Sequence, residues 1–174
     1  IDKDENKAVN IATETIDNFQ NIYETKWLNM MRDKLGLFGE DISDKKLINN
    51  LLIWMEDNKA DYTNTFCHLM SIEINHNKVY DDNNFINWSN EWKQRILKNN
   101  NSKEKSIALM KISNPNVIPR NHKVEEALNS ANEGNLGILI KLLSVLKKPY
   151  SSQETIEDYQ LPSTNNNYQT FCGT

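Results

Sequence analysis

Two cysteines and three histidines are the residues of this sequence best suited to chemistry near neutral pH. Cys172 stands third from the carboxyl end, beside a glycine, where a thiol has no obvious packing role. A thiol on such a tail can reach a partner and exchange with it through its thiolate. An equally weighted alternative is that Cys172 is a small buried residue that anchors the tail together with Phe171. Cys67 lies in the helical apolar pattern YTNTFCHLM, which favours core packing.

The histidines predict neither a zinc site nor a catalytic base. His68, His76 and His122 form no HExxH pair, and no CxxC motif accompanies them. His122, Glu125 and Glu126 would place an imidazole and carboxylates on one helical face, as a general base requires. Such a cluster at a helix start is more often a solvated face favoured by the helix dipole. We therefore predict no metal ligand and no catalytic residue in this chain, with His68 and His76 at the surface.

The glycines argue against a nucleotide site. The 5 glycines form neither a GxG nor a GxxxxGK motif, although backbone amides that cradle phosphates need glycines at close spacing. No segment has the metal-binding Asp turn of a kinase or a catalytic Asp followed by Asn. We therefore expect no cofactor-binding residue in these 174 residues.

Composition and charge argue against a nucleic-acid-binding protein and a membrane protein. A length of 174 residues with 38% hydrophobic residues predicts one domain with a real core. The chain has 20 Lys and Arg residues against 24 Asp and Glu residues, so it lacks the positive charge that attracts nucleic acid. Trp54, Trp88 and Trp92 are expected to pack in the core and not to stack on bases. No apolar run approaches the ~20 residues that span a membrane. Two cysteines are too few for the disulfide framework of a small secreted domain, so we predict a cytoplasmic protein. The start at Ile1 rather than Met suggests an excised piece of a longer protein.

The elements that position these residues are predicted from apolar spacing. Ile16, Phe19, Tyr23, Trp27 and Met30 draw one apolar stripe along a helix that ends near Gly36. The same spacing, with caps such as Ser43, Ser102 and Asn135, recurs in the segments 45–58, 61–70, 85–97, 102–113, 120–133 and 136–148. The fold class is therefore all-α. We expect a compact domain of about six helices at 1–150 that ends in an antiparallel helical hairpin, and an irregular, extended tail at 151–174.

The segment NPNVIPRN at 114–121 has two prolines and interrupts the helices. Val117 and Ile118 are apolar enough to pack, so we predict a buried or half-buried linker that orients the last hairpin. The guanidinium of Arg120 is expected to donate hydrogen bonds to carbonyls that the proline-broken backbone leaves open.

Five segments and the last residues together resemble the carboxy-terminal region of a known family. The segments are MMRDKLGLF at 30–38, KADYTNTF at 59–66, WSNEWKQRIL at 88–97, NPNVIPRNHKVEEAL at 114–128, and KKPY followed by the ending YQTFCGT. They resemble the selenoprotein O family, kinase-like proteins that act as protein adenylyltransferases. The most specific segment is NPNVIPRNHKVEEAL, because generic helical packing would not produce its two prolines and polar insert.

The resemblance implies that residues 1–150 are an accessory helical domain of a larger enzyme that transfers AMP from ATP to protein hydroxyls. ATP and Mg²⁺ or Mn²⁺ would bind to an upstream kinase-like region, which would be this chain's partner along with the protein substrates. Cys172 matches a redox position third from the end of family members, where it would pair with a cysteine outside this chain. Cys67 departs from the arginine that related sequences commonly have there. The alternative is a free-standing helical module that binds another protein.

Overall fold

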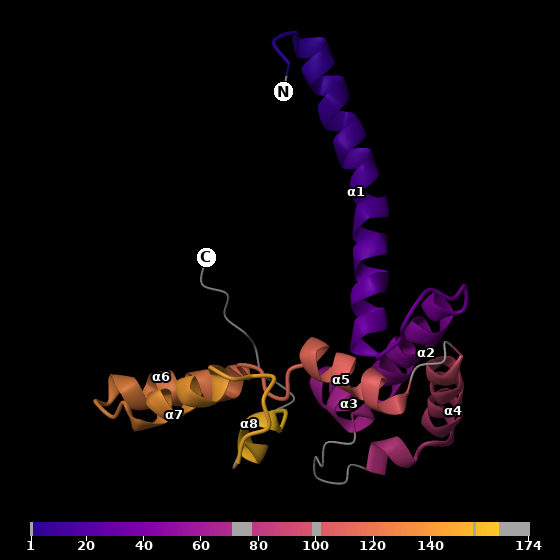
Figure 1. The fold of residues 1–174 in the computed structure, drawn as a ribbon. Coiled ribbons are helices and arrows are strands. Elements are labelled where there is room, and N and C mark those ends of the chain that lie inside the picture. Colours follow the sequence, from indigo (N-terminus) through magenta and orange to yellow (C-terminus); the bar gives the residue numbers. More distant parts are fainter. Residues whose placement is uncertain (1, 71–77, 99–101, 155, 164–174) are drawn as a thin grey trace.

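The computed structural model describes residues 2–70, 78–98, 102–154 and 156–163. The described residues form helices and connecting loops without a strand, which confirms the all-α prediction (Figure 1). The helices are α1 (Glu5–Lys34), α2 (Asp44–Asp57), α3 (Tyr62–Leu69), α4 (Asn83–Leu97), α5 (Lys103–Ser113), α6 (Asn121–Asn132), α7 (Gly137–Leu146) and α8 (Glu157–Gln160), with a short 3-10 helix at Lys78–Asp81. None of the described helices is both long and apolar enough to cross a bilayer.

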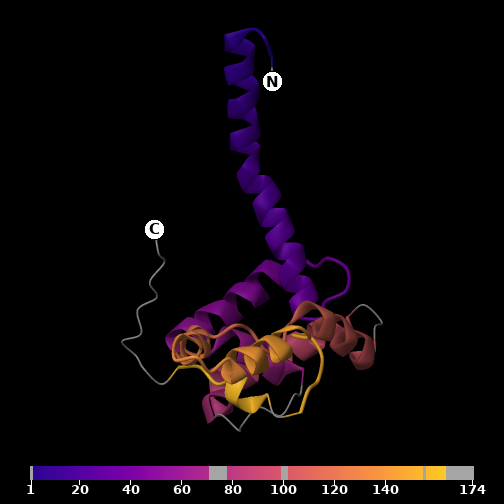
Figure 2. The same cartoon turned by 90° about the vertical axis from the view of Figure 1, so that its left-hand side faces the viewer.

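Helix α1 stands away from the rest of the molecule over most of its 30 residues (Figures 1 and 2). The Asp4 side chain accepts hydrogen bonds from the amides of Asn6 and Lys7 and so caps its start. Only its last turns enter the core, where Met31 is buried. The predicted apolar stripe exists, but most of it faces solvent: Phe19 is 64% exposed.

The larger core lies among the end of α1 and helices α2, α3, α4 and α5. Its buried side chains include three tryptophans, which confirms that Trp54, Trp88 and Trp92 pack in the core. Their indole N–H groups are satisfied: Trp88 donates to the Leu47 carbonyl and Trp92 to the Leu35 carbonyl, both at 2.8 Å. Burial of these rings stabilises the core, and it does so without leaving a buried N–H group that lacks a hydrogen-bond acceptor.

Gly36 ends α1 near the predicted position. Its φ of +67° lies in the left-handed region, which glycine adopts without steric cost. A Cβ at this position would lie 2.6 Å from the backbone oxygen of Ser106 in α5. The backbone at the end of α1 therefore packs directly against the backbone of the first turns of α5.

A second, smaller core holds the last helices together. Helices α6 and α7 lie side by side as the predicted hairpin (Figures 1 and 2). Gly134, with φ of +87°, follows the end of α6, and the Asn135 side chain accepts from the Gly137 amide at 2.9 Å. Val117 of the proline linker is buried here, as predicted, together with Ala127, Leu142, Val145, Ile156 and Tyr159.

The observed helices depart from the sequence predictions in number, in the tail and at one predicted cap. Seven α-helices lie in the described part of residues 1–150, where about six were expected, and α8 lies beyond them. The segment 151–174 is not wholly extended, because α8 forms within it and buries Ile156 and Tyr159 against the second core. Ser43 precedes α2, but its hydroxyl donates to Asp41 instead of capping the helix. The Ser102 side chain does cap α5, as predicted. The division of the chain into a domain at 1–150 and a tail at 151–174 stays a prediction.

Candidate functional site

Of the two cysteines, the structure describes Cys67 and not Cys172. Cys172 lies outside the described residues, so its redox role stays a prediction. Cys67 is buried in α3, as predicted, and its Sγ lies 3.6 Å from the Pro115 carbonyl oxygen. Burial, together with the nearby negative charge of Asp61, raises the pKa of the Cys67 thiol to about 11. A covered, protonated thiol is a core residue and a poor nucleophile.

We expect Cys67 to react very slowly with thiol reagents in the native protein. Because the thiolate is the reactive species, a pKa near 11 leaves little of it at pH 8. Timed alkylation of the Cys172→Ser variant, read by peptide mass spectrometry, isolates Cys67. Its labelling should accelerate by orders of magnitude in denaturant. Fast labelling in the native state would contradict the burial described here.

Arg120 lies at the centre of a polar network between the two cores. Its guanidinium donates to Asp61 at 2.5 and 2.9 Å and to the Gln160 backbone oxygen at 2.7 Å. Asn64 joins the same group, since its amide also donates to the Gln160 oxygen at 3.0 Å. Arg120 was expected to bind carbonyls of the proline-broken linker; the carbonyl that it binds lies instead in α8, and its main partner is the Asp61 carboxylate. The network ties α3 of the first core to α8 of the second.

Asp61 serves two roles in this network. Its Oδ1 caps α3 by accepting from the Asn64 amide at 2.8 Å, while both oxygens bind Arg120. Burial raises the pKa of Asp61, but the hydrogen bonds from Arg120 and the Asn64 amide outweigh it and leave the pKa below its ordinary value. The carboxylate is therefore ionised at neutral pH and is engaged as an acceptor.

A second buried carboxylate, Asp44, binds two arginines from different helices. Asp44 is fully buried at the start of α2. Arg32 of α1 and Arg95 of α4 each place Nε at 2.7 Å from one of its oxygens. Burial raises the pKa of Asp44, yet the hydrogen bonds from Arg95 and Arg32 lower it further than burial raises it. This triad joins α1, α2 and α4 through charge-assisted bonds.

The histidines do not gather into a site within the described residues. His122 is partly buried at the start of α6, and burial, with the nearby charges of Lys123 and Arg120, lowers its pKa. His68 is partly buried rather than at the surface, because its ring stacks on Tyr80 with centroids 3.9 Å apart. His76 lies outside the described residues. No group of three His, Cys, Asp or Glu side chains in the described ranges is placed to hold a metal ion.

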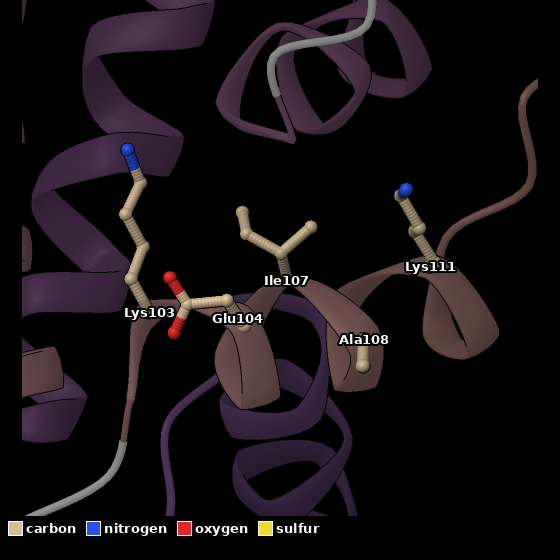
Figure 3. Close-up of a pocket in the computed structure, with 5 residues that line it drawn as sticks. All are labelled: Lys103, Glu104, Ile107, Ala108 and Lys111. Carbon is tan, nitrogen blue, oxygen red and sulfur yellow. The ribbon is translucent and has the colours of Figure 1, made fainter.

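One shallow pocket of about 440 Å³ lies along α5. Figure 3 shows Lys103, Ile107 and Lys111 projecting to the same side of the helix, with Glu104 beside them. Lys103, Lys105 and Lys111 are exposed along this helix. The lining residues that the structure describes belong to α5.

Sequence reasoning missed the Asp44 triad. One signal was available: Arg95 falls on the apolar face marked by Phe85, Trp88 and Trp92, where a charged side chain needs a buried partner. Taken together, the buried charged groups described here connect helices. Their oxygens accept hydrogen bonds from arginines and from backbone amides, so the arrangement suits a scaffold that holds its helices in register.

Comparisons with known proteins show the family of this chain. The family model described as protein adenylyltransferase SelO matches residues 7–147. A protein nucleotidyltransferase YdiU of Pelagibacter ubique is 51% identical over all of this chain, and namesakes from Alkaliphilus metalliredigens and Clostridium perfringens are 41% and 43% identical. The chain spans only 35–36% of the length of these three relatives. By the extent of the family match, the chain belongs to the protein adenylyltransferase SelO family.

Proposed function

We propose that this chain is the helical, non-catalytic part of a protein adenylyltransferase that transfers AMP from ATP to protein hydroxyls. The observation that carries the proposal is the engagement of two carboxylates, the buried Asp44 and the half-buried Asp61, by arginines that tie helices together. A carboxylate so engaged is unsuited to bind Mg²⁺ or accept a proton from a substrate hydroxyl. ATP and the divalent metal would then bind the remainder of the full-length protein, which would also meet the protein substrates.

The test compares the full-length protein with the 174-residue chain. Transfer of labelled AMP to protein, with Mg²⁺ or Mn²⁺, is expected from the full-length protein alone. Calorimetry should detect no saturable Mg-ATP binding to the 174-residue chain, which has no phosphate-binding glycine motif. Micromolar 1:1 binding to this chain would contradict the non-catalytic assignment. A coding sequence that begins within a few codons of Ile1 would instead favour the free-standing interaction module.

We further propose that Cys172 is a regulatory thiol in the cytoplasmic parent enzyme. Its support is its place third from the end, which matches the family's redox position. In the full-length protein, AMP transfer should change between oxidised and reduced samples, and Cys172→Ser should abolish that difference. Cys67→Ala is the matched control, because Cys67 is buried and should leave the redox response intact. A redox response that persists in Cys172→Ser would contradict the regulatory role.

A further inference from the structure

An apolar stripe on α1 faces solvent along the part of the helix that stands clear of both cores. Val9, Ile16, Phe19 and Tyr23, which we call the α1 stripe, are 57%, 72%, 64% and 57% exposed. Their spacings of seven, three and four residues place them on one helical face. The rings of Phe19 and Tyr23 lie 6.2 Å apart, which makes one continuous aromatic surface.

The α1 stripe continues an interface that already exists at the base of the helix. Trp27, four residues after Tyr23 on the same face, packs against the first core. Figures 1 and 2 show the helix leaving that core and extending away from it in both views. Helices gain most of their stability from packing an apolar face, so an exposed face of this length indicates a surface that a partner covers.

The charges of the exposed part of α1 disfavour a second copy of the chain as the covering surface. Residues 5–25 carry four acidic side chains, Glu5, Glu14, Asp17 and Glu24, against the single basic Lys7, and only Glu24 of the four has an ion-pair partner in the described residues, Lys45 at 3.3 Å. A second copy would bring two segments of the same negative sign together, which is unfavourable. An apolar surface of a different region would cover the exposed apolar face without this repulsion.

The length of the relatives indicates where that surface belongs. Nearly two thirds of each matched relative lies outside the segment that this chain covers, while the chain itself is matched over 97–100% of its length. A region of that size has ample surface for a helix of this length. Packing within one polypeptide also avoids the loss of translational freedom that a separate partner incurs.

We propose that the α1 stripe packs onto an apolar surface of the polypeptide outside these 174 residues, and so joins the helical part to the rest of the enzyme. The inference rests on the proposed function, because it requires that the chain be part of a longer protein. Phe19 and Tyr23 are the central contacts, and Trp27 links the new interface to the first core.

Hydrogen exchange of the full-length protein tests this directly. The amides of residues 9–23 should exchange as slowly as those of α2, because the covered helix opens only when the interface does. Phe19→Glu should speed their exchange by at least about tenfold and leave α2 unchanged. The matched control is Asn18→Glu, which adds the same charge at an exposed neighbour away from the α1 stripe. Unprotected amides at 9–23 in the wild-type protein would overturn the inference.

A photoreactive phenylalanine analogue at position 19 of the full-length protein identifies the occupant. We expect cross-links to peptides outside these 174 residues, within a product of monomer mass. Cross-linked dimers joined through α1 would overturn the inference in favour of a second copy. The AMP-transfer assay is independent of both readouts: protected and cross-linked α1 without AMP transfer supports the interface while contradicting the proposed function.

Discussion

Asp44→Asn is expected to lower the free energy of unfolding by about 3 to 5 kcal/mol, the usual loss when one partner of a buried ion pair is removed. The carboxylate is fully buried and accepts from Arg32 and Arg95, each at 2.7 Å. An amide offers one oxygen and no charge, so at least one guanidinium would remain buried without an anion. The residue also accepts from the Asp41 amide at 3.0 Å, so the turn before α2 should loosen as well.

Denaturant unfolding of wild type and variant measures this loss, with Asp57→Asn as the control. Asp57 is exposed at the end of α2, so its substitution should change stability by less than about 0.5 kcal/mol. Because the pKa of Asp44 lies below its ordinary value, the wild type's advantage should be complete above about pH 4 and shrink as the pH falls through the lowered pKa. Equal midpoints for Asp44→Asn and wild type at pH 7 would refute the assigned role.

Arg120→Ala is expected to cost about 3 kcal/mol and to release α8 from the first core. Removing the guanidinium leaves Asp61 as a half-buried carboxylate without its counter-charge. It also removes a 2.7 Å hydrogen bond to the Gln160 carbonyl, which then depends on Asn64. The free energy of unfolding from denaturant titration gives the cost, and hydrogen exchange of residues 157–160 reports the release.

Arg120→Lys separates charge from geometry at this position. A lysine keeps the positive charge but cannot donate to Asp61 and Gln160 through one planar fork. We therefore expect it to recover part of the stability lost in Arg120→Ala. An unchanged denaturation midpoint in Arg120→Ala would mean that the network between the two cores is energetically neutral.

The helices could be predicted because their signals are local. The stripe of α1, the Ser102 cap of α5 and the Gly134 end of α6 each depend on residues within a few positions of one another. The same local pattern could not say that Phe19 is exposed, because a helical stripe marks an apolar face without naming what covers it. Helix α8 escaped prediction since its four residues are too few for periodicity and pack through Ile156 and Tyr159.

The site was predictable only where one residue carried its own signal. Arg120 stood out beside two prolines, and it does bind a backbone carbonyl. Its carboxylate partner Asp61 lies 59 positions earlier, and no spacing rule joins residues that far apart. Asp44 and Arg95, 51 positions apart, present the same difficulty. Long-range ion pairs depend on the packing of whole helices, which the sequence specifies only collectively.

The approach of α1 to α5 at Gly36 limits how sequences of this fold can diverge. Position 36 excludes side chains twice, first by its φ of +67° and again because a Cβ would lie 2.6 Å from the Ser106 backbone oxygen. Backbone cannot rotate aside as a flexible side chain can, so even alanine would require α5 to shift as a unit. A relative with another residue at this position should therefore show compensating changes along α5, most directly at Met110, whose Cγ lies 3.0 Å from the same point. Substitutions at position 36 and substitutions in the facing part of α5 are therefore expected to occur together.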